Sequence, residues 1–199
     1  EVPSRGQALS ESRFEHLSFQ GNTSNSLVIQ FKTVDNQCLW LVSEADQANP
    51  YLAPRVKEAL PLSDLSRIAL SGSVNPLART IFLPEPAHEW CYYFEKAQLA
   101  VQQARWDDVK ALWQAVNDGG LKTGVAIEYL PFIEGLARGG DFATALAISQ
   151  RAASIDLKMQ DPLCRTWQAV FESGGTASPG AASYRQAVVD QLGCGYLIK

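Results

Sequence analysis

The pattern of apolar and polar positions changes once along this chain, near residue 86. Before that point the clearest features are two short apolar runs, residues 27–31 and 38–42, which flank a polar segment. Both runs are rich in β-branched and aromatic residues and have the length of strands, so they predict a β-hairpin. Residues 14–19 fit no single helical face, and we expect them to add a third strand.

Prolines punctuate residues 43–86 and limit the regular structure that this segment can form. One short helix fits between Pro54 and Pro61, because proline is tolerated in the first turn of a helix. A turn capped by Ser63-Asp64 fits residues 63–68, and residues 80–83 fit a further strand. The rest of the segment is expected to be an irregular connector.

The segment Pro84-Glu85-Pro86 is predicted to be a stiff, extended linker. We therefore place a domain boundary there. Residues 1–86 form a small β-containing subdomain with a proline-rich connector, and residues 87–199 form a helical domain.

After residue 87, apolar residues recur at three- and four-residue spacing, which is the period of α-helices. Glycine pairs at 119–120 and 139–140, and Gly193, are expected to end helices; Asp161-Pro162 is expected to start one, with the aspartate as N-cap. About six helices are predicted. Their apolar faces carry Trp90, Tyr93, Phe94, Ala97, Val101, Val109, Leu112, Trp113, Val116, Leu130, Ile133, Leu136, Phe142, Ala145, Leu146, Leu163, Trp167, Val170, Tyr184, Val188 and Leu192.

Two of the predicted helical hairpins align at an offset of 36 residues. The aligned pairs are Ala97 with Ile133, Ala100 with Leu136, Ala104 with Gly140, Trp106 with Phe142, and Leu112 with Ile148. Small residues at helix crossings and an aromatic after the turn are typical of tetratricopeptide-like repeats, although a generic helical bundle also fits. The predicted fold class is α+β and mainly α, with a small N-terminal β-sheet packed on a C-terminal tetratricopeptide-like helical array.

The last six residues, 194–199, are largely apolar. We expect them to dock on the rest of the protein, with a strand added to the N-terminal sheet as the specific prediction. Loss of this segment would then lower the melting temperature.

The composition excludes some classes of function. The 199 residues include 17 basic and 21 acidic side chains, so a basic footprint for nucleic acid is absent and no nucleic-acid partner is predicted. The longest apolar run, residues 38–42, is far shorter than the roughly 20 residues that span a bilayer. The chain begins at Glu1 without a leader-like pattern, which favours an excised piece of a longer protein.

The four cysteines, Cys38, Cys91, Cys164 and Cys194, form no CxxC pair, and no histidine lies at a zinc-ligand spacing from them. No metal site and no cofactor are therefore predicted. Four cysteines allow three complete pairings, among which the sequence does not choose. Four free, buried thiols is the favoured interpretation, although an oxidising compartment would favour disulfides.

No hydrolase, nucleotide-binding or dinucleotide-binding motif is present, and no catalytic residue is predicted. Cys91 lies near His88 at a predicted helix start, and a cysteine beside a histidine can act as a nucleophile with its base. The aromatic neighbours of Cys91 favour instead a thiol that is packed in the core. Glu95 and Lys96, with Glu128 and Glu134, fit a groove lined by carboxylates. Solvated helix faces have the same composition, and the spacing that glycoside chemistry needs is not fixed by sequence.

The bulky residues at 90–94 cannot all face one way on a helix. We expect them chiefly to join the two halves of the chain, and the alternative is a recognition surface, for which exposed aromatics are well suited. The candidate binding surface consists of His88, Trp90, Tyr93, Glu95 and Lys96.

Residues 88–100, HEWCYYFEKAQLA, resemble a segment in large bacterial polytopic membrane proteins described as glycosyltransferase-like. In that family a soluble C-terminal region follows many membrane helices, and this segment leads into tetratricopeptide-like helices. Four further runs are similar and lie in the same order, so the resemblance covers roughly residues 14–170. These runs are CLWLV at 38–42, NPYL at 49–52, EALPLS at 58–63 and LPFIE at 130–134.

The resemblance implies a non-catalytic accessory domain that mediates protein–protein contacts or positions an acceptor. Its partners would be the membrane portion of the same full-length protein, other proteins or a glycan. It further implies the extracytoplasmic side of a membrane, where disulfides form. The chain departs from the family by having no membrane segment, so no catalytic residue is carried over. Two rival hypotheses are a carbohydrate- or lipid-carrier-binding module and a stand-alone hydrolase.

Overall fold

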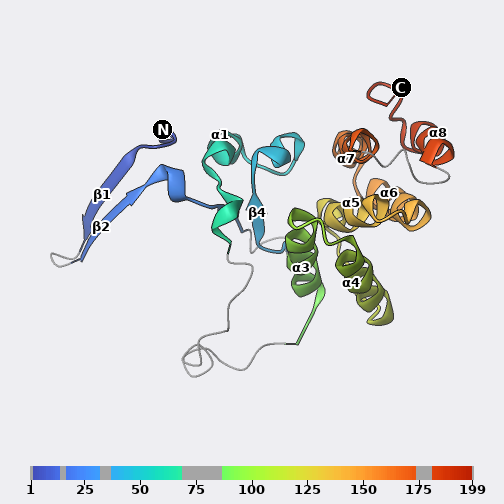
Figure 1. Cartoon of the computed structure of the whole chain (residues 1–199), viewed down its shortest axis with the longest axis horizontal. Helices are drawn as coiled ribbons and strands as arrows, with labels where there is room; N and C mark the ends of the chain where they lie inside the picture. Colours follow the sequence, from blue (N-terminus) through green and yellow to red (C-terminus); the bar gives the residue numbers. More distant parts are fainter. Residues whose placement is uncertain (1, 14–16, 32–36, 69–86, 174–180, 199) are drawn as a thin grey trace. The chain divides into compact units, whose positions relative to one another are not determined.

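A computed structural model describes residues 2–13, 17–31, 37–68, 87–173 and 181–198 (Figure 1). The described residues are mainly helical, with two small antiparallel sheets of two strands each. The predicted class, α+β and mainly α, is confirmed. The chain divides into two compact units, one of Glu1–Phe31 and Leu39–Ala87 and one of Lys32–Cys38 and His88–Lys199. The second is called the helical unit below.

The first sheet of the N-terminal unit is a hairpin that sequence reasoning found only in part. Strand β1, Ala8–Arg13, pairs antiparallel with β2, Leu17–Asn22. β2 overlaps the third strand expected at 14–19, of which residues 14–16 lie outside the described residues. The expectation that this strand joins the later hairpin is wrong, because it pairs with β1. Residues 8–13 are mostly small and polar, so they gave little apolar signal.

The second sheet pairs β3, Val28–Gln30, with β4, Trp40–Val42, in antiparallel register. This confirms the predicted hairpin in a shorter form. Cys38 lies outside the ladder, because its backbone N–H donates to a carboxylate of the helical unit, as described below.

The other described elements of the N-terminal unit are short helices. The predicted helix between prolines is α1, Pro54–Ala59, with Pro54 in its first turn. The turn predicted at 63–68 is a 3₁₀ helix, Leu65–Arg67, whose cap is Asp64, since the Asp64 carboxylate accepts from the Ser66 N–H. Further 3₁₀ turns span Thr23–Asn25, Glu44–Ala48 and Leu60–Leu62. Residues 80–86, which include a predicted strand and the predicted linker, lie outside the described residues.

The helical unit contains the six predicted helices. They are α3 (Trp90–Gln102), α4 (Trp106–Asp118), α5 (Leu130–Arg138), α6 (Phe142–Ile155), α7 (Gln160–Glu172) and α8 (Ala181–Leu192). Short 3₁₀ helices η5 (Ala126–Tyr129) and η6 (Leu157–Met159) precede α5 and α7. Asp161 is not the N-cap that was predicted, because η6 runs directly into α7 and places Asp161 in the first turn. No helix of the described segments is long and apolar enough to cross a membrane.

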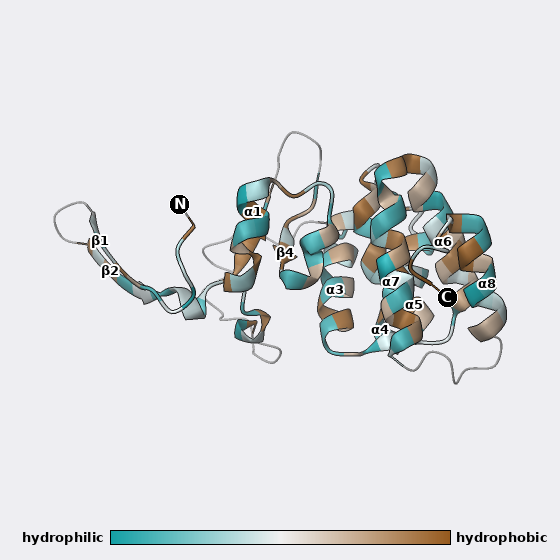
Figure 2. Ribbon diagram, turned by 90° about the horizontal axis from the view of Figure 1, so that it is seen from above, coloured by the Kyte–Doolittle hydropathy of each residue, from teal (hydrophilic) through white to brown (hydrophobic). Residues whose placement is uncertain are grey.

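The six helices pack mainly on near neighbours in the chain (Figures 1 and 2). The two helices of each hairpin, α3–α4, α5–α6 and α7–α8, contact each other. The first helices of successive hairpins, α3 with α5 and α5 with α7, also pack together. Helices α4 and α5 approach each other closely at Gly135 of α5, where a Cβ atom would lie 2.6 Å from the Val109 side chain of α4. This nearest-neighbour pattern is the one expected of stacked helical hairpins.

The turns of the first two hairpins have the same hydrogen bonds at the predicted offset of 36. Ala104 and Gly140 both have positive φ, 51° and 88°. The following N–H groups, of Arg105 and Asp141, donate to the carbonyls of Ala100 and Leu136 at 2.9 and 2.8 Å. This is the Schellman arrangement, in which a left-handed residue ends the helix. The aligned sequences therefore fold alike, although the first copy has alanine where glycine is favoured.

The C-terminal segment docks, but not as the predicted strand. Residues 194–198 form a turn in the helical unit, with N–H groups of Leu197 and Ile198 donating to the Cys194 carbonyl. Ile198 is buried, and the Tyr196 hydroxyl contacts the Asp161 carboxylate at 3.2 Å. A disulfide from Cys194 to Cys164 of α7 holds the segment against the helices. The sequence could not predict this because the bond depends on the tertiary arrangement.

Candidate binding surface on the first helical hairpin

The candidate residues gather at the start of α3, and the core beneath them is aromatic. Trp90 is 7% exposed, and its ring lies 5.0 Å from that of Tyr129 and 5.6 Å from that of Phe132, measured between centroids. Phe94, one turn later, is also buried. Trp90, although predicted as part of the surface, is therefore a core residue that anchors the helix.

A buried carboxylate fixes the start of α3. Glu128, in η5, is fully buried, and its two oxygens accept three hydrogen bonds of 2.8 Å each. Oε2 accepts from the Trp90 indole N–H and the Thr123 hydroxyl, and Oε1 accepts from the Cys38 backbone N–H. A buried charged group needs such partners, because desolvation without them is costly. Glu128 thus joins three separate parts of the chain.

This placement overturns the predicted groove of carboxylates. Glu128 lies in the core, and Glu134 pairs with Arg138 on α5 at 2.8 Å, so neither converges with Glu95 and Lys96. The signal for a buried Glu128 was present in the sequence, since apolar residues flank it on both sides, at 126–127 and 129–130.

All four cysteines are in disulfides, so the prediction of free buried thiols is wrong. Cys38 is bonded to Cys91 and Cys164 to Cys194, with Cα–Cα distances of 5.1 and 5.2 Å. Glu128 holds the Cys38 backbone beside α3, where Cys91 is the second residue. Cys91 therefore offers no thiolate, and the nucleophile–base hypothesis for Cys91 and His88 is also wrong.

An ordered stack of side chains follows one outer face of α3. Tyr92 and Lys96 are four residues apart, which places them on one side of α3, and His88 lies in the segment just before the helix. The His88 and Tyr92 rings are stacked 3.6 Å apart and parallel to within 4°, and the Lys96 ammonium lies 5.6 Å from the Tyr92 ring centroid. Tyr93 contacts the Tyr92 ring edge-on at 5.3 Å. Of the predicted residues, His88, Tyr93 and Lys96 thus meet through Tyr92.

Tyr92 was not among the predicted site residues. The four-residue spacing of Tyr92 and Lys96 on the predicted helix was the signal that could have found it. Glu95 projects from a different side of α3, because it is one residue, about 100°, away from Lys96 on the helix. Burial raises the pKa of the Glu95 carboxyl above its ordinary value.

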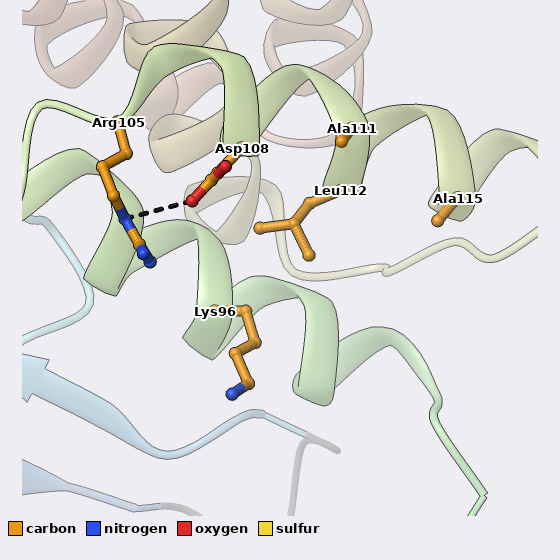
Figure 3. A pocket seen from close by; sticks show the side chains of 6 residues that line it. All are labelled: Lys96, Arg105, Asp108, Ala111, Leu112 and Ala115. Atoms are coloured by element: carbon orange, nitrogen blue, oxygen red, sulfur yellow. Dashed lines mark ion pairs between the residues drawn. The ribbon is translucent and has the colours of Figure 1, made fainter. Parts of the chain in front are cut away.

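A shallow groove of about 340 Å³ continues this surface between α3 and α4 (Figure 3). Four of the residues that line it come from one stripe of α4, at i, i+3, i+4 and i+7: Asp108, Ala111, Leu112 and Ala115. Lys96 of α3 and Arg105 of the connecting turn line the rest, and Arg105 pairs with Asp108 at 3.1 Å. The floor is apolar and the rim is charged. We call this feature the α3–α4 groove.

The His88–Tyr92–Lys96 stack holds flexible side chains in order, which reduces the entropy lost when a partner binds. In the described ranges we find no group of three or more His, Cys, Asp or Glu side chains that could bind one metal ion.

The chain has no match among protein-family models, curated proteins or solved structures. The resemblance of residues 88–100 to glycosyltransferase-like membrane proteins therefore stays a prediction. The functional conclusion rests on the geometry of the α3 stack and the α3–α4 groove.

Proposed function

We propose that the helical unit is a non-catalytic interaction module, an accessory domain of a longer membrane-bound protein of the glycosyltransferase-like kind. It contacts another protein through the first helical hairpin. The contacting surface consists of the α3 stack (His88, Tyr92, Tyr93 and Lys96) together with the α3–α4 groove.

The observation that carries this proposal is the ordered, solvent-facing combination of aromatic, cationic and apolar groups on one hairpin. Aromatic side chains are enriched where proteins bind each other, because they supply a large contact area. Lys96 belongs both to the stack and to the lining of the groove, so the two features are continuous. Stacked helical hairpins also provide extended surfaces of this type.

The two disulfides support the proposed extracytoplasmic location. Disulfides persist in oxidising compartments and are rare where glutathione and thioredoxin keep thiols reduced. Both bonds tie non-helical segments, around Cys38 and Cys194, to helices of the unit. A carbohydrate partner is less well supported at the stack, because a sugar that stacks on Tyr92 needs a free ring face and His88 covers one.

Site-specific photo-cross-linking in native membranes tests the proposal. A benzophenone amino acid replaces Ala111, in the groove, in the full-length protein. The matched control carries the same group at Lys110, which is exposed on the same helix but outside the groove.

The expected result is a discrete cross-linked protein adduct from position 111 and none from position 110. Lys96→Glu should weaken that adduct at least several-fold, because it alters the rim without touching the core. Absence of any adduct from position 111, or equal labelling from both positions, would contradict the proposal.

A further inference from the structure

The α3–α4 groove is lined by residues of α4 that α5 does not cover, among them the exposed Asp108 and Ala111. On the other side of the α3–α4 hairpin, α5 packs against both α3 and α4, and Gly135 of α5 meets Val109 of α4 closely. Val109 is buried there, whereas Asp108 and Ala111, its neighbours on the helix, are exposed around the groove. One side of the hairpin therefore already receives a helix, and the groove lies on a side that does not.

Stacked helical repeats need an outer face that is polar, because no further repeat covers it. The outer face of the α3–α4 hairpin departs from this rule at its centre, where Ala111, Leu112 and Ala115 form an apolar floor. Small residues in such a stripe allow another helix to approach closely and to place its own ridge of side chains in the groove.

The charges on the rim of the groove indicate which charge a bound partner would carry beside its apolar surface. Three charged residues line it, and Asp108 is already paired with Arg105. The groove therefore has a net positive rim, with Lys96 held above the Tyr92 ring at one side. A helix that carries carboxylates beside its apolar stripe is complementary to this arrangement.

From these observations we propose that the α3–α4 groove binds an amphipathic α-helix of a partner protein, whose apolar stripe lies on Ala111, Leu112 and Ala115 and whose flanking carboxylates pair with Lys96 and Arg105. This inference rests on the proposed interaction function and names the chemistry of the partner. The docked helix extends the stack by one element on the side opposite to α5.

Peptide binding to the complete, oxidised chain tests the inference. The probe is a synthetic amphipathic helical peptide with an alanine–leucine stripe and glutamate on both flanks. A second peptide has the same stripe and lysine flanks. Fluorescence anisotropy gives the dissociation constants, and amide chemical shifts locate the binding site.

The glutamate-flanked peptide should bind at least tenfold more tightly than the lysine-flanked peptide, with shifts confined to α3, α4 and their turn. Lys96→Glu combined with Arg105→Glu should reverse that preference. Lys110→Glu, which reverses one charge outside the groove, should leave both constants within twofold. Ala111→Trp fills the groove at an exposed position and should abolish binding without changing the melting temperature.

Equal affinity for the two peptides, or shifts located on α6–α8, would overturn the inference. If cross-linking from position 111 captures a protein in membranes while no helical peptide binds, the interaction function stands and the helical partner is wrong. If a second copy of this chain is the captured protein and the peptides do not bind, the groove is a self-association surface, which also overturns the inference.

Discussion

Each end of the helical unit has a buried tryptophan and a disulfide, but the hydrogen-bond acceptor of the tryptophan differs between the two ends. At each end a disulfide ties an irregular segment to a helix, and a buried indole N–H finds an acceptor nearby. At the α3–α4 end, Trp90 donates to the carboxylate of Glu128. At the α7–α8 end, Trp167 donates at 3.0 Å to the hydroxyl of Ser149, which in turn donates to the Ala145 carbonyl.

The two ends differ in how many segments of the chain must supply hydrogen-bond partners to the acceptor. A hydroxyl that bonds its own helix is self-contained, whereas a buried carboxylate requires donors from several segments. The α3–α4 end also places Ala104 in a left-handed conformation. Departures from local preference of this kind concentrate at functional sites, and the candidate surface lies at this end.

The largest expected effect comes from removing the charged acceptor. Glu128→Ala leaves the Cys38 N–H and the Trp90 indole N–H buried without an acceptor, each at about 1–3 kcal/mol, so the free energy of unfolding should fall by about 2–6 kcal/mol. Ser149→Ala, the matched change at the other end, strands one donor and should lower it by about 1–3 kcal/mol. Urea denaturation of the oxidised protein measures both. A larger loss for Ser149→Ala would reverse the comparison.

The disulfides provide the next contrast. Cys38→Ser with Cys91→Ser opens a bond between residues 53 apart, and Cys164→Ser with Cys194→Ser opens one between residues 30 apart. Each pair of substitutions should lower the free energy of unfolding by about 3–4 kcal/mol, with the first loss greater by about 0.5 kcal/mol from loop closure alone. Thermal unfolding of the two double variants would decide this. An opposite order of stability means that native contacts outweigh loop entropy.

A smaller effect is expected at the turns that end α3 and α5. Ala104→Gly should raise the free energy of unfolding by up to about 1 kcal/mol, because glycine adopts positive φ without the penalty that alanine has there. Gly140→Ala places alanine in the matching turn and should lower it by about 1 kcal/mol. Guanidinium unfolding curves for the two variants should shift in opposite directions. Shifts in the same direction would show that the two turns are not equivalent.

The smallest effect depends on pH and involves Glu95. Burial raises the pKa of this carboxyl in the folded protein, so between its ordinary pKa and the raised value the folded state binds more protons than the unfolded state. Stability therefore falls as pH increases through that interval and stays lower above it. Glu95→Gln should remove this dependence and stabilise the protein at neutral pH by less than about 0.5 kcal/mol, since the side chain is largely exposed and solvent screens it.

Melting temperatures at pH 4 and pH 7 for the wild-type and Glu95→Gln proteins measure this difference. Glu89→Gln serves as a control at an exposed position before α3. Equal pH dependence in the wild type and in Glu95→Gln would contradict the assignment.

The helices could be predicted from sequence because their signals are local. Helices α1 and α3–α8 were predicted from apolar residues at helical spacing, from glycine pairs, and from Pro54 and Pro131 in first turns. The offset of 36 residues predicted two turns that have the same hydrogen bonds. β1 was missed because residues 8–13 carry almost no apolar alternation. The Asp161 cap failed because η6 continues directly into α7.

The candidate site could be predicted less well, because its parts meet through tertiary structure. His88, Tyr93 and Lys96 were found from composition, whereas the apolar floor contributed by α4 and the role of Tyr92 depend on how two helices pack. Cysteine pairing could not be deduced, since 53 and 30 residues separate the partners and three pairings were possible. Glu128 was assigned to the surface because a glutamate is rarely buried unless several donors converge on it.

The two disulfides close loops that follow one another along the chain without overlapping. When the chain is pulled from its ends, the residues inside either loop cannot extend while the disulfides are intact. At about 3.4 Å per extended residue, the oxidised chain is about 280 Å shorter at full extension than the reduced one. In a protein tethered at a surface, the oxidation state would therefore set the distance over which this module can be drawn from its anchor under tension.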